Sequence, residues 1–307
     1  MYDLAIIGGG PAASAAAVYA ARKLLKTLLI TDTFGGQSVV SADIENWIGT
    51  QKISGEELAK NLEAHVRAYA GTVVDIMKGE KVKSISSEDG HFHLMTEKGK
   101  SLPAKTVLVA SGGNRKKLEV PGAKEFDNKG VTYCASCDGP LFSDQDVVVV
   151  GGGNAGFETA AQLLAYCKSV TLLQRGQAFA ADPTTVEKVL AHPNMRGVLN
   201  AETLEVIGEK FVTGLRYKNS MTGEEHALSI SGVFVEIGMV ASTQFVDGLV
   251  DMDQYKRIIV DARAQRTSMD GIWAAGDCTN GLYHQNNIAA GDAVKALEDI
   301  YIYLKTR

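Results

Sequence analysis

Two stretches of this chain share one pattern, in which a short apolar run is followed by a glycine-rich turn and then by apolar residues at helical spacing. Residues 4–7 precede the first turn, and residues 147–150 precede the second. An apolar run of this length is typical of a strand buried on both faces of a parallel sheet. The pattern therefore predicts an α/β protein with two related units.

Other apolar segments extend both units. Glycines after residue 109 mark a boundary, so we expect a second domain over residues 113–243. Strands are predicted at 27–30, 107–109, 170–173, 233–237, 258–260 and 272–275, and an antiparallel ribbon is predicted at 82–95. Helices are predicted at 55–69, after the second glycine turn as far as residue 166, and from about residue 287 toward the C-terminus.

Composition narrows the class of protein. The 307 residues are 45% apolar and 22% charged, which excludes a disordered or collagen-like chain. A net charge of -5 gives no reason to expect nucleic acid or an anionic membrane as a partner. Asp3 and Gly8 interrupt the N-terminal apolar run, and no stretch reaches the roughly 18 apolar residues of a spanning helix, so we expect a cytoplasmic protein.

A pair of cysteines lies just before the second glycine turn. Cys134 and Cys137 have the spacing at which one thiol attacks a disulfide and the other resolves the mixed disulfide. Asp138 follows directly and is a candidate for moving the proton. A zinc site would need two more ligands, but Cys167 and Cys278 are distant from each other and have no His at ligand spacing, so we expect redox chemistry and no metal.

The first glycine turn fits a dinucleotide site. Gly8, Gly10 and Ala13 match G-x-G-x-x-G/A, and Pro11 suits the start of a helix whose N-terminus stabilises a pyrophosphate. Asp32 follows the next strand, where an acid accepts a hydrogen bond from a ribose hydroxyl, although a turn residue is the alternative.

The second glycine turn is a second such site. Gly151, Gly153 and Gly156 follow a strand and precede a helix. The next strand ends at Leu173. Gln174 and Arg175 follow it at the position where an acid selects NADH and arginines select NADPH. This strand end supplies the Arg175 guanidinium and no carboxylate, so it accommodates either cofactor. The alternative is that Arg175 is only a solvated surface charge.

A third strand end carries a carboxylate. Asp277 follows Gly276 after the apolar segment at 272–275, and a helix comes next. A carboxylate there accepts hydrogen bonds from a sugar-like hydroxyl, and the helix N-terminus favours negative charge. The alternative is a helix or turn cap.

The chain contains two dinucleotide fingerprints, a Cys-x-x-Cys-Asp motif before the second of them, and Gly-Asp-Cys near its end. With these motifs it resembles the low-molecular-weight thioredoxin reductases over nearly its whole length. Residues 34–37, 43–46, 137–141 and 232–238 look closer still to the reductase core of the alkyl hydroperoxide reductase flavoprotein subunit, without its N-terminal thioredoxin-like domains. The resemblance implies two Rossmann-like three-layer dinucleotide-binding domains, the second inserted into the first. It also implies a homodimer.

The resemblance implies that the first domain, residues 1–112 plus 244–307, binds FAD. His284 replaces the usual Arg or Lys of the family beside the flavin. The residues implied to bind FAD are Gly8, Gly10, Pro11, Ala12, Ala13, Asp32, Gly35, Gly36, Gln37, Asn46, Gly276, Asp277, His284, Gln285 and Asn286.

The resemblance implies that residues 113–243 bind NADH or NADPH. Relatives that use NADPH carry His-Arg-Arg at positions 174–176 and Arg at 180, of which only Arg175 matches, whereas relatives from peroxide systems carry Glu at 174. Because most of the basic residues that would bind the 2′-phosphate of NADPH are missing, NADH is slightly favoured. The residues implied to bind this cofactor are Gly151, Gly153, Asn154, Ala155, Gly156, Gln174 and Arg175.

The implied activity is electron transfer from NAD(P)H through FAD and the Cys134–Cys137 dithiol to a disulfide of thioredoxin or a thioredoxin-like protein. The resemblance implies that Cys137 faces the flavin and that Cys134 attacks the partner. It also implies a domain rotation that brings the nicotinamide and the dithiol to the flavin in turn. The alternatives are a flavin-dependent oxidase of small dithiols that uses oxygen, a reductase with a non-nicotinamide donor, a redox sensor that binds a partner, and a ferredoxin reductase, which lacks the dithiol.

Overall fold

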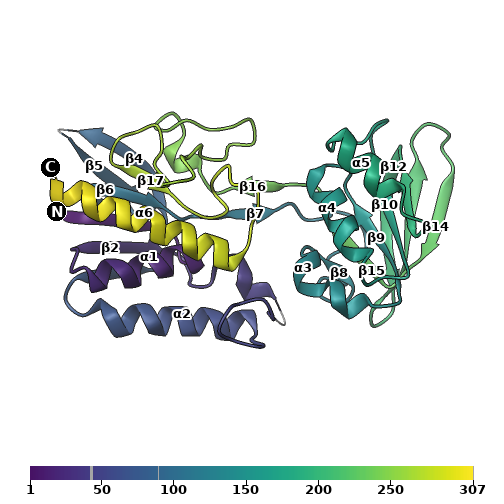
Figure 1. Ribbon diagram of the computed structural model, residues 1–307, viewed down its shortest axis with the longest axis horizontal. Helices are drawn as coiled ribbons and strands as arrows, with labels where there is room; N and C mark the ends of the chain where they lie inside the picture. Colours follow the sequence, from purple (N-terminus) through teal and green to yellow (C-terminus); the bar gives the residue numbers. More distant parts are fainter. Residues whose placement is uncertain (42–43, 89, 307) are drawn as a thin grey trace. The chain divides into compact units, whose positions relative to one another are not determined.

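The computed structural model describes residues 1–41, 44–88 and 90–306. The chain forms two compact units: Met1–Asn114 with Val240–Arg307 is unit 1, and Arg115–Met239 is unit 2. Unit 2 is therefore inserted into the sequence of unit 1. Its two connections to unit 1 include β7 (Gly113–Arg115) and β16 (Met239–Ala241), which pair as a two-stranded sheet (Figure 1).

The centre of unit 1 is a parallel sheet in the order β3-β2-β1-β6, with β17 beside the second half of β6. The antiparallel ribbon β4–β5 pairs with the first half of β6. The elements are β1 (Tyr2–Ile7), α1 (Pro11–Arg22), β2 (Thr27–Thr31), η1 (Gly36–Val40), α2 (Gly55–Ala70), β3 (Val74–Lys78), β4 (Val82–Glu88), β5 (His91–Thr96), β6 (Ser101–Val109), η3 (Gln244–Val246), β17 (Ile272–Ala274) and α6 (Asn286–Thr306).

Alternate residues of each central strand of unit 1 enter different cores. Leu4 and Ile6 pack with the alanine-rich face of α1 and with α6. Ala5 and Ile7 pack instead with the ribbon and with the segment that contains Val246. Because side chains alternate across a strand, one apolar run supplies both cores, and the unit has three layers.

Unit 2 contains a parallel sheet in the order β11-β10-β9-β15-β8 and an antiparallel sheet β12-β13-β14. Its elements are β8 (Val131–Thr132), α3 (Ala135–Asp138), η2 (Gly139–Phe142), β9 (Asp146–Val150), α4 (Asn154–Leu163), β10 (Ser169–Leu173), α5 (Pro183–Leu190), β11 (Met195–Val198), β12 (Ala201–Gly208), β13 (Val212–Asn219), β14 (Glu225–Ser229) and β15 (Gly232–Val235).

The valines of β9 divide between two cores in the same way. Val147 and Val149 pack with Phe157 of α4, while Val148 and Val150 pack with Leu215 of the antiparallel sheet. The parallel sheet is thus the middle layer between helices and a second sheet. The predicted α/β class with two three-layer units, one inserted into the other, is confirmed.

Three sequence predictions differ from the structure. The segment 258–260 forms no strand, since Ile258 makes only isolated bridges and fills the core of unit 1 from a loop. Helix α4 ends at Leu163 rather than 166, because the chain must turn to begin β10 at Ser169. The predicted strand 233–237 ends at Val235, so Glu236 lies beyond it. The antiparallel sheet of unit 2 was not predicted.

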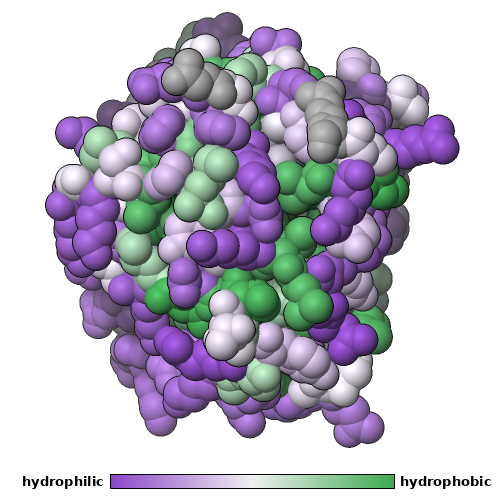
Figure 2. Space-filling model, turned by 90° about the vertical axis from the view of Figure 1, so that its left-hand side faces the viewer, coloured by the Kyte–Doolittle hydropathy of each residue, from purple (hydrophilic) through white to green (hydrophobic). Residues whose placement is uncertain are grey.

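One face of the molecule is mostly hydrophilic. Figure 2 shows the side on which both chain ends lie, where polar side chains surround smaller apolar areas. Over the described part of the chain, no helix combines the length and apolar character needed to cross a membrane.

Candidate active site

The glycine turn after β1 leaves room for a ligand at one position. Gly8 has φ 133°, and a Cβ there would lie 2.1 Å from the carbonyl oxygen of Ala110. A Cβ at Gly10 would meet nothing nearer than the Cα of Gly36, at 3.9 Å. The turn is therefore closely packed against β6 and open at Gly10, where α1 begins with Pro11. This opening fits the close approach of a pyrophosphate.

The first turn of α1 adds an observation that the sequence did not predict. Ala12 and Ala13 are buried under the turn, as is Ser14, which is only 1% exposed. The hydroxyl of Ser14 has no hydrogen-bond partner among the described residues. Buried hydroxyls are normally hydrogen-bonded, so this unsatisfied group near the helix N-terminus also fits a ligand with hydrogen-bonding atoms.

The segment after β2 places two further glycines beside the first turn. Gly35 and Gly36 have φ 95° and 58°, and the Gly35 N–H donates to the carbonyl of Gly9 at 2.8 Å. Gln37 donates its side-chain amide to the carbonyl of Gly113. Asp32 follows β2 directly, and its half-exposed carboxylate lies 3.2 Å from Lys81. The positive φ values explain why glycines occupy this turn.

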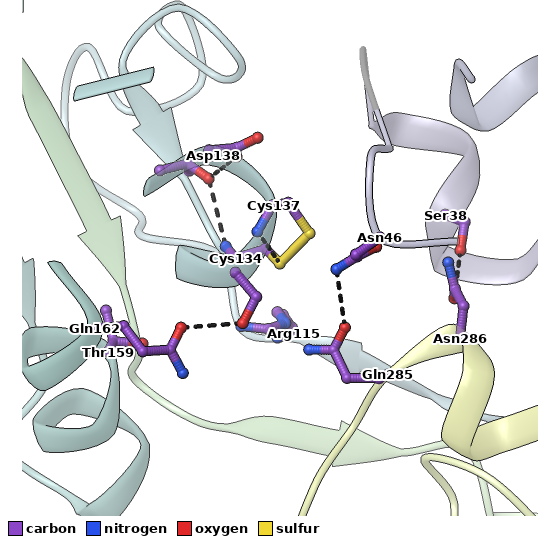
Figure 3. The surroundings of a disulfide bond; sticks show 12 residues. Ser38, Asn46, Arg115, Cys134, Cys137, Asp138, Thr159, Gln162, Gln285 and Asn286 are labelled. Atoms are coloured by element: carbon purple, nitrogen blue, oxygen red, sulfur yellow. Dashed lines mark hydrogen bonds between the residues drawn. A yellow bond between two sulfur atoms is a disulfide. The ribbon is translucent and has the colours of Figure 1, made fainter. Parts of the chain in front are cut away.

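Hydrogen bonds join the segment before α2 to the start of α6. Asn46 donates to the Gln285 side chain at 3.2 Å, and Ser38 donates to the Asn286 side chain at 2.8 Å (Figure 3). Asn287 donates to the backbone carbonyl of Asn46 at 2.7 Å. The structure thus brings the predicted residue Asn46 into one group with the predicted residues Gln285 and Asn286, which are distant from it in sequence. Ser38 and Asn287 were not predicted, and residues 42–43 of the segment lie outside the described residues.

The loop after β17 completes this group. Gly276 has φ 77°, and a Cβ there would lie 3.1 Å from Ala289 of α6. Asp277 is partly exposed, and its carboxylate lies 3.5 Å from Nδ1 of His284. The ends of β1, β2 and β17 therefore present polar groups at one edge of the sheet, as ligand sites of parallel sheets do.

The glycine turn after β9 in unit 2 repeats the geometry of the first. Gly151 has φ 124°, and a Cβ at Gly156 would lie 1.8 Å from the carbonyl oxygen of Gly151. Apart from its chain neighbours, a Cβ at Gly153 would meet no atom of the described residues within 4 Å. Asn154 and the exposed Ala155 then begin α4, with the Asn154 side chain accepting from the Asp182 N–H at 2.8 Å. The open position again fits a pyrophosphate at a helix N-terminus.

Gln174, after β10, binds the second turn. Its carbonyl oxygen accepts from the Gly152 N–H at 3.3 Å, and its amide donates to the carbonyl of Ala178 at 3.1 Å. Arg175 is exposed. Both polar groups of the Gln174 side chain are thus engaged with the backbone, which leaves Arg175 as the charged side chain at this strand end.

Cys134 and Cys137 form a disulfide that begins two residues after β8. Cys134 is the N-cap of the short helix α3, and its sulfur accepts from the Cys137 N–H at 3.2 Å (Figure 3). A donor directed at this sulfur stabilises negative charge on it once the disulfide is reduced. The arrangement therefore suits Cys134 to act as a nucleophile.

Thr132 connects Asp138 to the dithiol. Its hydroxyl donates to the Asp138 carboxylate and accepts from the Cys134 N–H at 3.3 Å. The Asp138 N–H donates to the Cys134 carbonyl at 3.0 Å. Thr132 is only 5% exposed, so its position is fixed by the core. Thr132 was not predicted, although its place two residues before Cys134 is visible in the sequence.

A buried carboxylate after β15 was also missed. The Glu236 side chain is 12% exposed, accepts from the Thr159 hydroxyl at 3.0 Å and lies 3.2 Å from Arg115. Burial raises the pKa of Glu236, and the Arg115 charge and the Thr159 hydroxyl offset only part of this effect. The available signal was a single acid following a strand with no polar side chain.

The other two cysteines are free thiols in the cores. Burial raises the pKa of Cys167 and of Cys278 to about 11 each. Cys278 donates to the carbonyls of Val109 and Ala275. Neither thiol is suited to ionise near neutral pH, so neither is a candidate for thiolate chemistry.

Comparison with known proteins agrees with this geometry. The model of the pyridine nucleotide-disulphide oxidoreductase family matches residues 2–293. In solved structures, the thioredoxin reductase of Streptococcus pyogenes is similar, with a TM-score of 0.90 and 35% identity over 100% of this chain and 99% of that one.

Two curated relatives are each 40% identical to the chain. They are an NADH dehydrogenase of Bacillus subtilis and an alkyl hydroperoxide reductase component of Escherichia coli. Each similarity covers 99% of this chain and 58% of the relative. The chain thus spans little more than half the length of these relatives.

Proposed function

This chain belongs to the pyridine nucleotide-disulphide oxidoreductase family, an assignment that makes it an oxidoreductase with FAD and NAD(P)H as cofactors, and we propose that it reduces a disulfide of thioredoxin or a thioredoxin-like protein. The observation that carries this proposal is the Cys134–Cys137 disulfide beside Asp138, in the same unit as the Gly151 turn. A thioredoxin reductase of the same architecture supports the choice of substrate.

The proposal assigns one cofactor to each glycine turn. FAD binds the domain of residues 1–112 plus 244–307, with its pyrophosphate at Gly10. NAD(P)H binds residues 113–243, with its pyrophosphate at Gly153. The space at both glycines and the unsatisfied Ser14 hydroxyl support this assignment. When bound, the cofactors supply the electron pair that reduces the disulfide to two thiols.

The dithiol then passes the electron pair to the partner. The Cys134 thiolate attacks the partner disulfide, forms a mixed disulfide and releases one partner thiolate. The Cys137 thiolate attacks the Cys134 sulfur, so the Cys134–Cys137 disulfide forms again and the second partner thiolate leaves. Asp138 takes one proton from each thiol of the dithiol in turn and returns each to a leaving partner thiolate. The Cys137 N–H at the Cys134 sulfur supports this division of roles.

The first experiment is anaerobic stopped-flow mixing of the FAD-loaded protein with NADH and, separately, with NADPH, followed by flavin absorbance. Rapid bleaching by either cofactor is expected, and NADH is expected to be faster. Bleaching by neither would contradict a nicotinamide donor and leave a different electron donor as the explanation.

The second experiment tests the disulfide substrate with Cys134→Ser and Cys137→Ser. Both variants are expected to retain FAD and flavin bleaching but to lose the reduction of an added thioredoxin. Full turnover of thioredoxin by either variant would contradict the dithiol mechanism. Oxygen-dependent oxidation of small dithiols without NAD(P)H consumption would instead identify the wild type as a dithiol oxidase.

We further propose that the protein acts in the cytoplasm as a homodimer. The family resemblance supports the dimer, and two free buried thiols are compatible with a reducing compartment. Sedimentation equilibrium of the FAD-loaded protein measures the mass directly. A mass of one chain at micromolar concentration would contradict the dimer.

A further inference from the structure

Glu236 lies between the second glycine turn and the dithiol. The strand order β9-β15-β8 places the end of β15 between the ends of the other two strands. Gly151 follows β9, Glu236 follows β15 and Cys134 lies two residues after β8. The backbone is close as well, since a Cβ at Gly151 would lie 2.2 Å from the Glu236 carbonyl oxygen.

Glu236 lies on the side of the glycine turn toward which one half of a bound dinucleotide would extend. In such sheets the pyrophosphate lies at the glycine turn, and the adenosine ribose lies over the end of the next strand, here β10. The other half of the dinucleotide therefore extends across β9 toward β15 and β8. Glu236 is the charged side chain at the end of β15.

The contacts of Glu236 hold its carboxylate but do not saturate it. Thr159 of α4 donates to Oε1, and one nitrogen of Arg115 lies 3.2 Å and 3.3 Å from the two oxygens. A carboxylate offers about four acceptor positions, so Oε2 retains capacity for another donor. Keeping a mostly buried carboxylate beside a partly exposed cation is also costly compared with an apolar contact, which argues against packing as the sole role of Glu236.

We propose that Glu236 is a positioning residue for the nicotinamide, whose carboxamide N–H donates to the free position on Oε2. This inference rests on the proposed binding of NAD(P)H at the Gly151 turn. The hydrogen bond fixes the rotation of the nicotinamide ring about its glycosidic bond. Thr159 and Arg115 fix the carboxylate that receives it.

The test measures binding in the absence of turnover. Calorimetry of the FAD-loaded, oxidised protein gives the Kd of NAD+ and NADP+ and of their 3-acetylpyridine analogues, in which a methyl ketone replaces the carboxamide. The wild type is expected to prefer the carboxamide about tenfold. Glu236→Leu is expected to bind both forms equally. Glu236→Gln, which keeps a neutral acceptor, is expected to retain about a threefold preference.

The control is Glu187→Gln, which removes an exposed carboxylate from α5. It is expected to keep the full preference, and FAD content and thermal midpoint establish that each variant is folded. A wild-type preference that persists in both Glu236 variants would overturn the inference but not the proposed function. Failure of the wild type to bind NAD+ or NADP+ would overturn both.

Discussion

Thr132 and Asp138 are joined by a hydrogen bond that connects the last residue of β8 to the last residue of α3. The same hydroxyl accepts from the Cys134 N–H, so one side chain bridges the candidate acid–base group and the backbone of the candidate nucleophile. In the proposed mechanism Asp138 exchanges a proton with a sulfur atom, so its orientation would control that transfer. Thr132 would then act as a positioning residue for Asp138 and Cys134.

Replacing Thr132 tests this role. Thr132→Val preserves the shape of the side chain but removes the hydroxyl, so we expect thioredoxin reduction to fall roughly tenfold, less than the roughly hundredfold cost of losing an acid–base group. Loss of the hydroxyl also changes the hydrogen bonding of the Asp138 carboxylate, so we expect the pH profile of the exchange to change. The measurement is the pH profile of dithiol–thioredoxin exchange in single-turnover experiments.

Thr132→Ser provides the matched control, because serine keeps the hydroxyl. It is expected to retain most of the rate and the wild-type pH profile. An unchanged profile in Thr132→Val, with a slower rate, would assign Thr132 a packing role only.

Local features of the site were predictable from the sequence. Three glycines were predicted because a Cβ at each would collide with backbone, either of its own βα unit or of the segment that follows a neighbouring strand. They are Gly8, Gly151 and Gly156. The Cys134–Cys137 pairing likewise depends on a spacing of three residues. Such constraints appear directly in the residue types.

Contacts between distant segments were not predictable from spacing. Asn46 and Gln285 are 239 positions apart, and only the family resemblance indicated that they share a site. Glu236 and Arg115 are 121 positions apart, and their pairing depends on β15 ending before Glu236 rather than continuing to residue 237. The apolar run at 258–260 also led to a wrong strand prediction, because Ile258 is buried without belonging to a strand.

The glycines of the second turn should differ in what they contribute. In Gly153→Ala the added Cβ meets no protein atom, so we expect normal folding but loss of NAD(P)+ binding, because the methyl group occupies the space for the pyrophosphate. In Gly156→Ala the Cβ meets the Gly151 carbonyl at 1.8 Å, so we expect a lower thermal midpoint. Calorimetric titration and thermal unfolding separate the two effects. Unchanged NAD(P)+ affinity in Gly153→Ala would place the pyrophosphate elsewhere.

The choice between NADH and NADPH should depend on Gln174 and Arg175. Gln174→Glu adds a carboxylate that accepts from ribose hydroxyls and repels a 2′-phosphate, so we expect the NADH-to-NADPH ratio of kcat/KM to rise about tenfold. Arg175→Ala removes the exposed cation and should reduce kcat/KM for NADPH more than for NADH. Steady-state kinetics with both cofactors measures these ratios. Equal losses for both cofactors would show that Arg175 does not approach the 2′-position.

Glu236 should also affect the pH dependence of stability. Because burial raises its pKa, the folded protein binds the Glu236 proton more tightly than the unfolded chain does. Its contribution to stability is therefore complete below the unfolded pKa of about 4.3 and is lost as the pH rises through the higher folded value. Glu236→Gln removes this dependence, so the variant should gain stability relative to wild type as the pH rises above about 4. Urea unfolding midpoints of both proteins across this range test the sign. A relative loss with rising pH would mean that the Arg115 ion pair outweighs the cost of burial.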